Sequence, residues 1–336
     1  MSKTKIVTLV CWVISALALI GLIIWFLFSG IFGGFSFGLD FGQGTFEPVG
    51  THSVPAQGID ALDIDWTSGR VSIRTHPGND ILITEFARRD LRDGEALSLR
   101  TDGGTLTIRF TERPLGIQLG NSLNKQLEVL IPYAISEDFD RFHVDTTSGR
   151  IEINNIQATD FTASTTSGRI ELSAIIAGQL NARTTSGRIE LRNITAQTIS
   201  AATTSGRIEV FDTTADDISL RTTSGSIATT NTETQSLRTH TAAGRHELFG
   251  SFGYVNARST SGRLEIVSQI TPEHVTAHAT SGRIEITVPR GDALSVQYST
   301  GSGRFTSELP VVTHSGADAQ FNLSTSSGRI SIFALR

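Results

Sequence analysis

The sequence predicts an all-β protein: a single-stranded right-handed parallel β-helix (β-solenoid) of about 19 residues per coil, preceded by one transmembrane α-helix. Three observations carry this prediction. The heptapeptide TTSGRIE occurs four times unchanged, starting at Thr146, Thr165, Thr184 and Thr203, so each copy begins 19 residues after the last. Apolar residues recur at fixed offsets from the glycine of each copy. The stretch from Ile6 to Phe28 carries no charge.

This uncharged stretch is long enough, at about 1.5 Å per residue, to cross a hydrocarbon core of about 30 Å as a helix. It lacks the small-residue cleavage site of a secretory signal peptide, so we expect an uncleaved signal anchor. Lys3 and Lys5 precede it, and the next Lys or Arg is Arg70. The positive-inside rule then places residues 1–5 in the cytoplasm. We expect a single-pass protein of the cell membrane with the bulk of the chain extracytoplasmic.

The composition changes after the anchor. Residues 29–58 are rich in Gly, Ser and Phe with almost no charge, which is typical of a flexible tether. Residues 59–336 are expected to form the extracytoplasmic solenoid, with irregular coils over 59–141 and regular repeats over 142–336. In the irregular part, Asp102-Gly103-Gly104 predicts a turn and the segment Pro114 to Lys125 a surface loop.

The glycine of each Ser-Gly-Arg-like turn serves as the reference of its repeat. Seven residues before it the chain always carries an apolar residue, and two residues after it an apolar residue stands in all repeats but one. Each repeat therefore reads as two short strands of period 2 that meet at a Ser-Gly corner. The reference glycines are Gly69, Gly149, Gly168, Gly187, Gly206, Gly225, Gly244, Gly262, Gly282, Gly303 and Gly328.

Two folds fit this pattern. In a meander, Ser-Gly would be a two-residue hairpin turn between antiparallel strands. In a solenoid it is a corner, and each strand pairs in parallel with its equivalent in the next coil. We favour the solenoid, because only in-register coils bring identical residues about 4.8 Å apart and so reward strict repetition. Right-handed winding follows from the crossover rule.

Charged residues follow most of these corners. Arginine comes directly after the glycine in most repeats, and glutamate two residues later, with an apolar residue between them, so both point outward. The Gly225 repeat loses both charges together, having Ser226 and Ala228 instead. The pattern predicts either an interaction stripe for an anionic envelope polymer or a partner protein, or a solvated salt-bridge face. The stripe consists of Arg150, Arg169, Arg188, Arg207, Arg245, Arg263, Arg283, Glu152, Glu171, Glu190, Glu209, Glu247, Glu265 and Glu285.

The sequence gives little support for nucleic-acid binding, a disulfide-stabilised fold, catalysis or metal binding. A formal net charge of -5 gives no reason to expect a nucleic-acid partner. The single cysteine, Cys11, excludes an internal disulfide framework. The Ser and Thr columns have no base beside them, and His246 takes an inward position normally held by isoleucine. We therefore expect no catalytic residues, no cofactor and no metal site.

Several segments together resemble a known family. They are LDIDWTSGRVSI, GGTLTIRF, LEVLIP, FHVDTTSGRIEI and ITVPRGDALSVQYSTGSGRF, and the likeness covers the chain from about Leu62 to Arg336. They resemble a bacterial adhesin-like family, a domain of unknown function with a β-helical fold found on cell-envelope proteins. The resemblance implies a surface-displayed β-solenoid and supplies no catalytic residues.

We expect a non-catalytic structural, adhesion or interaction module of the cell envelope. A first alternative is a self-assembling scaffold like the bactofilins, which would associate through the solenoid ends. The C-terminal segment GRISIFALR would then be an uncapped last strand. A second alternative is a carbohydrate-active β-helix enzyme of the pectate-lyase type, but the acidic or basic cluster that such enzymes carry in one groove does not stand out.

Overall fold

The computed structural model describes residues 45–111, 123–291, 293–312 and 319–335, and every regular element in these ranges is a β-strand. The predicted signal anchor, Ile6 to Phe28, lies outside the described residues, as do residues 29–44 of the predicted tether. Within the described ranges, no helix has the length and apolar character needed to span a membrane.

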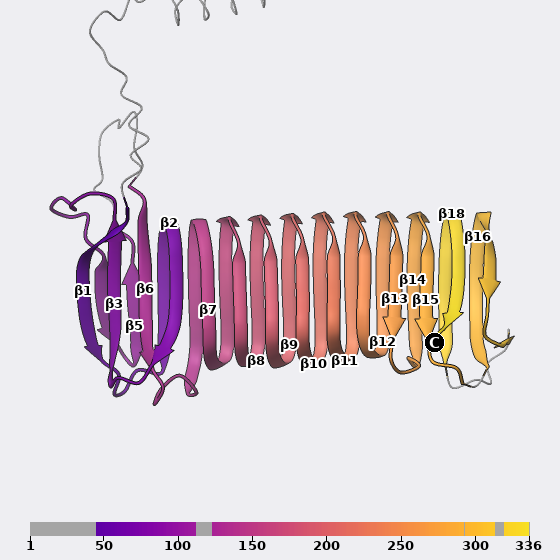
Figure 1. Ribbon diagram of the computed structural model, residues 1–336, viewed down its shortest axis with the longest axis horizontal. Helices are drawn as coiled ribbons and strands as arrows, with labels where there is room; N and C mark the ends of the chain where they lie inside the picture. Colours follow the sequence, from indigo (N-terminus) through magenta and orange to yellow (C-terminus); the bar gives the residue numbers. More distant parts are fainter. Residues whose placement is uncertain (1–44, 112–122, 292, 313–318, 336) are drawn as a thin grey trace, which may run out of the picture. The chain divides into compact units, whose positions relative to one another are not determined.

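The regular repeats form long strands stacked side by side in one sheet (Figure 1). Neighbouring strands are parallel, and Ile170, Ile189, Ile208 and Ile227 are successive register partners, each 19 residues from the next. The parallel, in-register stacking predicted from the repeat is confirmed, and hairpin pairing between repeats is absent from this part of the chain. The strands are β7 (Phe139–Ser167), β8 (Ile170–Ser186), β9 (Ile189–Ser205), β10 (Ile208–Ser224), β11 (Ile227–Ala243) and β12 (His246–Ser261).

The core lies inside the coils and is made of columns of like residues. Leu180, Ile199, Ile218 and Leu237, each seven residues before its reference glycine, are at most 2% exposed. Such burial contributes roughly 1.5–3 kcal/mol for each large aliphatic side chain. At the Ser-Gly corner the backbones approach so closely that a Cβ on Gly168 would lie 1.6 Å from the carbonyl oxygen of Gly149. Only glycine fits there, which explains the invariant glycine of the repeat.

The N-terminal end combines coils with antiparallel strands. Strand β2 pairs in parallel with β7 on one side and with β5 and β6 on the other. Strand β3 pairs antiparallel with β6 and β1, and β4 pairs antiparallel with β5. The bounds are β1 (Glu47–Pro55), β2 (Ala61–His76), β3 (Asp80–Ala87), β4 (Ser98–Asp102), β5 (Thr105–Arg109) and β6 (Lys125–Pro132).

This end corrects three expectations, the third of which concerns Lys125, and confirms one. Residues expected to form irregular coils include antiparallel strands, and the folded part begins earlier than predicted because β1 lies within the expected tether. The predicted turn is confirmed: Gly103 and Gly104 join β4 to β5 with φ angles of 53° and 79°, a conformation that glycine adopts readily. Antiparallel pairing does not place equivalent residues side by side, so these strands leave no repeat in the sequence from which they could be predicted.

Lys125 is the largest error at this end, because it was expected to close a surface loop. Its side chain is fully buried, and its Nζ lies 2.6 Å from Oε1 of Glu85, which is 1% exposed. The same Nζ donates to the carbonyl oxygen of Glu95 at 2.6 Å and lies 4.0 Å from the ring centroid of Phe110. The ion pair and these contacts compensate the desolvation of the ammonium group. The rest of the predicted loop, 114–122, lies outside the described residues.

At the C-terminal end the coils are not in chain order. Strand β18 lies between the coil of β14 and β15 and the coil of β16 (Figure 1). The expected uncapped last strand is therefore wrong: β18 is paired on both sides, and β16 forms the outer coil. The bounds are β13 (Leu264–Ser268), β14 (His274–Ser281), β15 (Ile284–Val288), β16 (Leu294–Ser307), β17 (Val311–Val312) and β18 (Gln320–Ala334).

The difference in side-chain polarity between β18 and β16 explains why β18 lies inside the stack and β16 at its end. Phe321, Leu323 and Ile330 of β18 are at most 1% exposed, so this strand gains by lying between two coils. The corresponding part of β16 is more polar, and its Tyr298 is half exposed. The more polar strand, β16, is therefore the one at the solvent-exposed end of the stack.

Candidate functional site

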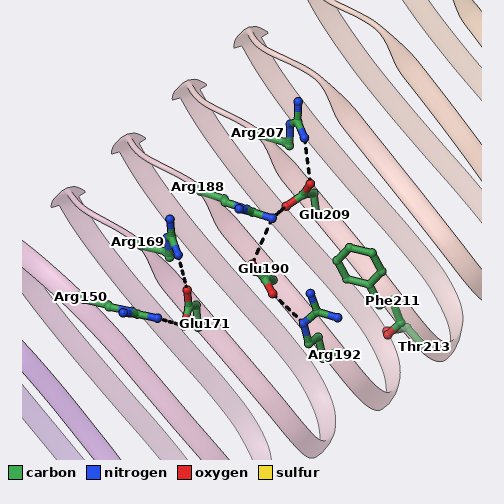
Figure 2. Close-up of polar contacts among 10 residues, drawn as sticks. All are labelled: Arg150, Arg169, Glu171, Arg188, Glu190, Arg192, Arg207, Glu209, Phe211 and Thr213. Carbon is green, nitrogen blue, oxygen red and sulfur yellow. Dashed lines mark hydrogen bonds and ion pairs between the residues drawn. The ribbon is translucent and has the colours of Figure 1, made fainter.

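The arginine and glutamate stripe occupies the outward face of the strand that follows each glycine corner. The residue between each pair, such as Ile170 or Ile189, is fully buried, so the pleat turns both charged neighbours outward. Figure 2 shows Arg150, Arg169, Arg188 and Arg207 in succession along the stack. Parallel register sets this arrangement, because equivalent residues of consecutive coils are direct partners.

Each predicted pair forms an ion pair within its own coil. The N–O distances are 2.6 Å for Arg150–Glu152, 2.9 Å for Arg169–Glu171, 3.3 Å for Arg188–Glu190, 3.1 Å for Arg207–Glu209, 2.9 Å for Arg245–Glu247, 3.4 Å for Arg263–Glu265 and 3.2 Å for Arg283–Glu285. The predicted mutual support of the two columns is confirmed, because no stripe arginine lies without a carboxylate partner.

Three arginines also bridge to the next coil. Arg150 contacts Glu171, Arg188 contacts Glu209 and Arg263 contacts Glu285 (Figure 2 shows the first two). Arg169 and Arg207 are paired only within their own coils. These three bridges link the coil of Gly149 to that of Gly168, the coil of Gly187 to that of Gly206 and the coil of Gly262 to that of Gly282.

The glutamates lie deeper than the arginines. The side chains of Glu209, Glu190 and Glu285 are 8%, 14% and 14% exposed, whereas the arginine side chains of the stripe are 35–59% exposed. The outer layer of this face is therefore a row of guanidinium groups resting on carboxylates. Such support fixes the orientation of the guanidinium fork before any partner arrives.

The electrostatics of the stripe follow from this geometry. Burial of Glu171 acts to raise its pKa, but hydrogen bonds from Arg150 and Arg169 outweigh burial and leave the pKa below its usual value. A hydrogen bond to Glu171 raises the pKa of Arg150, and one to Glu285 raises that of Arg263. At such exposure each pair contributes roughly 0.2–1 kcal/mol to stability.

Two residues outside the predicted stripe take part in it. Arg192 donates from Nε to Oε1 of Glu190 at 2.6 Å, and its guanidinium lies 4.1 Å from the ring centroid of Phe211 (Figure 2). Both stand five residues after their reference glycine, the next outward position along the strand. Their column varies too much between repeats for the sequence pattern to have identified them.

The stripe is interrupted once. Ser226 and Ala228 replace the charged pair in β11 and its corner, so the coils of Gly149 to Gly206 are separated from those of Gly244 to Gly282. At the other end of the first block, Arg70 extends the row, with its Nε 3.8 Å from Glu152. The stripe is thus two charged blocks on one face.

Parallel coils stacked in register, with internal columns of Ile, Leu and Thr and an external charged face, define a β-repeat protein of the solenoid type. The chain belongs to the Toastrack DUF4097 family, whose model matches residues 59–215 and again residues 177–333. The two matches together cover nearly all of the folded part. No curated protein matches the chain.

Solved structures from Bacteroides and Parabacteroides species are similar to this chain. A "putative adhesin" from Bacteroides fragilis is 11% identical over 85% of this chain and 96% of its own, with a TM-score of 0.42. A "putative adhesin" from Parabacteroides merdae is 10% identical over 87% and 97%, with a TM-score of 0.44. A "putative lipid binding protein" from Parabacteroides distasonis is 15% identical over 86% and 98%, with a TM-score of 0.42.

Proposed function

We propose that the chain is a non-catalytic adhesion or interaction module of the cell envelope, a right-handed β-solenoid held at the membrane by residues 6–28 with its coils outside the cell. Family membership and the regular coils support this assignment. A stack of equivalent coils offers long, flat outer faces on which one kind of contact repeats at coil spacing.

The observation that carries the proposal is the layered stripe. Its guanidinium groups lie outermost and are oriented by the glutamates beneath them, as at Arg188 and Glu190. A partner that meets this face encounters fixed donors with their carboxylates close by, so the surface is nearly neutral overall but strongly patterned. Patterned charge favours a protein partner that presents both signs of charge, because register and specificity come from complementary potentials.

A cell-based assay tests this function. Cells that lack the chain are complemented with the wild type or with a stripe variant that carries Arg150→Ser, Arg169→Ser, Arg188→Ser and Arg207→Ser. We expect the wild type to restore attachment of cells to one another under flow and the stripe variant, present in the membrane at equal amount, to fail. If deletion of the chain leaves attachment unchanged, the adhesion assignment is wrong. If cells with the wild type and cells with the stripe variant attach equally well, the stripe has no role in attachment.

A specific observation favours self-association as a second function. On its outer side β16 is paired only at Leu294 and Ser295, by β17, and the rest of that edge has no strand partner among the described residues. The edge strands of the opposite end are β1, which contains Pro48, Pro55 and a register shift, and the short β4, which carries the exposed Arg100 and Asp102; these features disfavour strand addition. One open end favours a closed dimer over a filament.

The oligomeric state of the full chain in detergent distinguishes these outcomes. We expect a dimer that the edge substitution Tyr298→Lys converts to a monomer, because a charge would be placed at the centre of the open edge. Sedimentation equilibrium measures the mass of both proteins. A wild type that stays monomeric up to high concentration, or that forms filaments in electron micrographs, would contradict the dimer.

A further inference from the structure

A second cationic surface lies on the strand segment that leads into the glycine corner, away from the stripe. Arg221, His240, Arg258 and His278 are successive register partners in β10, β11, β12 and β14, so four basic residues stand in one column. Arg238 lies two residues before His240 on the same outward face. All five side chains are exposed. We call these five residues the basic strip.

The basic strip differs from the stripe in its charge balance. The stripe matches every arginine with a glutamate, whereas the described residues supply the basic strip with one carboxylate, Asp217, 3.0 Å from Arg238. Arg221 and Arg258 form no ion pair with any described residue; Arg258 donates from Nε to the amide oxygen of Asn256 at 3.2 Å. Arg221, Arg238 and Arg258 lie on three adjacent strands, and a bound anion would relieve the repulsion between their charges.

Two adjoining depressions give this surface a shape. One, of about 350 Å³, is lined by Arg221, Arg238, His240 and Arg258. The other, of about 420 Å³, is lined by Arg238, Asn256, Tyr254 and the small Ser236. They share Arg238 and Asn256, so they form one continuous surface along consecutive coils.

The second depression adds an aromatic ring to the cationic groups. Tyr254 is 36% exposed and stacks on His274 with ring centroids 5.2 Å apart. Its hydroxyl donates to Oε2 of Glu273 at 2.5 Å, which fixes the ring at the edge of the surface. A fixed, exposed tyrosine ring presents an apolar face and a polar edge at once.

We propose that the basic strip and Tyr254 together bind a linear acidic polysaccharide, that is, a sugar polymer with carboxylate groups at regular intervals. The guanidinium groups bind the carboxylates, and Tyr254 packs against the C–H face of a sugar ring. Coil spacing repeats the cationic groups along the stack, which suits a polymer better than a single small anion. The apolar ring and the amide of Asn256 favour sugar units over a polymer of phosphate alone.

Binding of fluorescently labelled polygalacturonate to the full chain in detergent tests the proposal. The strip variant carries Arg221→Ser, Arg238→Ser and Arg258→Ser, and we expect it to bind roughly tenfold more weakly or worse. A control variant with Arg74→Ser, Arg92→Ser and Arg141→Ser makes the same charge change at exposed arginines of the N-terminal half. The control is expected to stay within about twofold of the wild type, because its arginines form no column.

A further variant and two further probes identify the ligand class. Tyr254→Ala is expected to weaken polygalacturonate binding roughly threefold to tenfold and to leave the binding of inorganic polyphosphate unchanged. Neutral dextran is expected not to bind. Equal weakening by the strip and control variants would overturn the proposal, since the attraction would then be diffuse. Equal affinity for polyphosphate and polygalacturonate, with no effect of Tyr254→Ala, would overturn the assignment to a sugar polymer.

This binding is separate from the proposed stripe function, because the two sets of residues lie on different faces. The stripe variant is expected to bind polygalacturonate as the wild type does while failing in cell attachment. Loss of polymer binding in the stripe variant with retention in the strip variant would overturn the proposal and leave the role of the stripe in attachment intact.

Discussion

Besides the Ser-Gly corner, each of five successive coils has a second bend, at which a non-glycine residue adopts the left-handed conformation. The residue stands six positions after the reference glycine, and its φ angle lies between 48° and 61°. Asn and Asp accept this conformation best among non-glycine residues, and the side chains of Asn231 and Asp212 are joined by a 2.7 Å hydrogen bond along the column. The five residues are Asn155, Ala174, Asn193, Asp212 and Asn231.

Ala174 is the exception in this column, and it predicts a stabilising substitution. Alanine is strained at a φ of 53°, so Ala174→Asn should raise the free energy of unfolding by about 1 kcal/mol. Urea denaturation of the full chain measures the change. Ala202→Asn, which introduces the same residue in the extended part of β9, is the matched control and should give no gain. A gain in the control alone would contradict the corner argument.

His246 predicts a pH dependence at the same scale. Its side chain is fully buried between Ile227 and Leu264, and its Nδ1 lies 2.8 Å from the hydroxyl of Thr239. Burial, with a smaller contribution from His240, lowers the pKa of His246 to about 4 from an ordinary value of 6.5. The neutral ring is therefore favoured in the folded state, and the unfolded chain takes up the proton first as the pH falls.

Stability should consequently be lost between about pH 6.5 and pH 4, by about 3 kcal/mol from this residue. His246→Ile restores the side chain normal for this column and should remove that part of the loss. The difference in unfolding free energy between the two proteins, followed from pH 7 to pH 4, isolates the contribution from carboxylates common to both. A difference that stays constant over this range would show that the histidine does not titrate on unfolding.

At the scale of elements, the antiparallel N-terminal strands depend on one buried ion pair. Lys125 at the start of β6 and Glu85 in β3 lie on adjacent strands, and Oε2 of Glu85 also accepts a hydrogen bond from the Leu97 amide at 3.1 Å. The pair therefore ties the β3–β6 contact to the segment that leads into β4. Removing one partner leaves an uncompensated charge in the interior.

A double substitution tests this dependence. Lys125→Met should destabilise the protein by about 3–5 kcal/mol, because the Glu85 carboxylate loses its partner. Lys125→Met with Glu85→Gln should recover at least about 2 kcal/mol, since glutamine carries no charge and still accepts from the Leu97 amide. Thermal and urea unfolding of the three proteins gives the comparison. A double variant no more stable than Lys125→Met would mean that the charge is compensated elsewhere.

The elements also show what a sequence pattern can predict. The coils from β7 to β12 could be predicted because parallel register makes each residue the neighbour of its own equivalent, so packing selects repetition. The pairing of Arg169 with Glu171 followed from the same logic, with the pleat setting the exposed face. The bridge from Arg150 to Glu171 depends on side-chain conformation, which no period encodes.

The order of coils at the ends could not be predicted. Strands β16 and β18 both carry a Ser-Gly-Arg corner with apolar residues at the inward offsets, so either fits against β14 and β15. The burial of Phe321 and Ile330 favours β18 in this position. The repeat pattern does not indicate this difference, because both strands match it. The buried Lys125 was equally hidden, because its partners come from antiparallel strands that share no pattern with the coils.

At the scale of the whole molecule, the folded part combines a regular middle with two differently closed ends. The antiparallel edge strands β1 and β4 protect one end, and β16 leaves most of its edge open at the other. Between them, two faces carry charge in different ways: the stripe pairs its arginines, and the basic strip leaves most of its cations without carboxylates. A single repeated unit thus supports two kinds of surface, because outward residues vary freely once the inward columns are filled.

The most direct test of the account is whether residues 19 apart are neighbours in space. In a Cys11→Ser background, Ser186→Cys with Ser205→Cys places thiols on register partners about 4.8 Å apart, within reach of a disulfide. The account predicts that mild oxidation links this pair in the folded protein but does not link Ser186→Cys with Ser224→Cys, two coils apart. Failure of the first pair, or equal linkage of the second, would contradict in-register stacking and every surface derived from it.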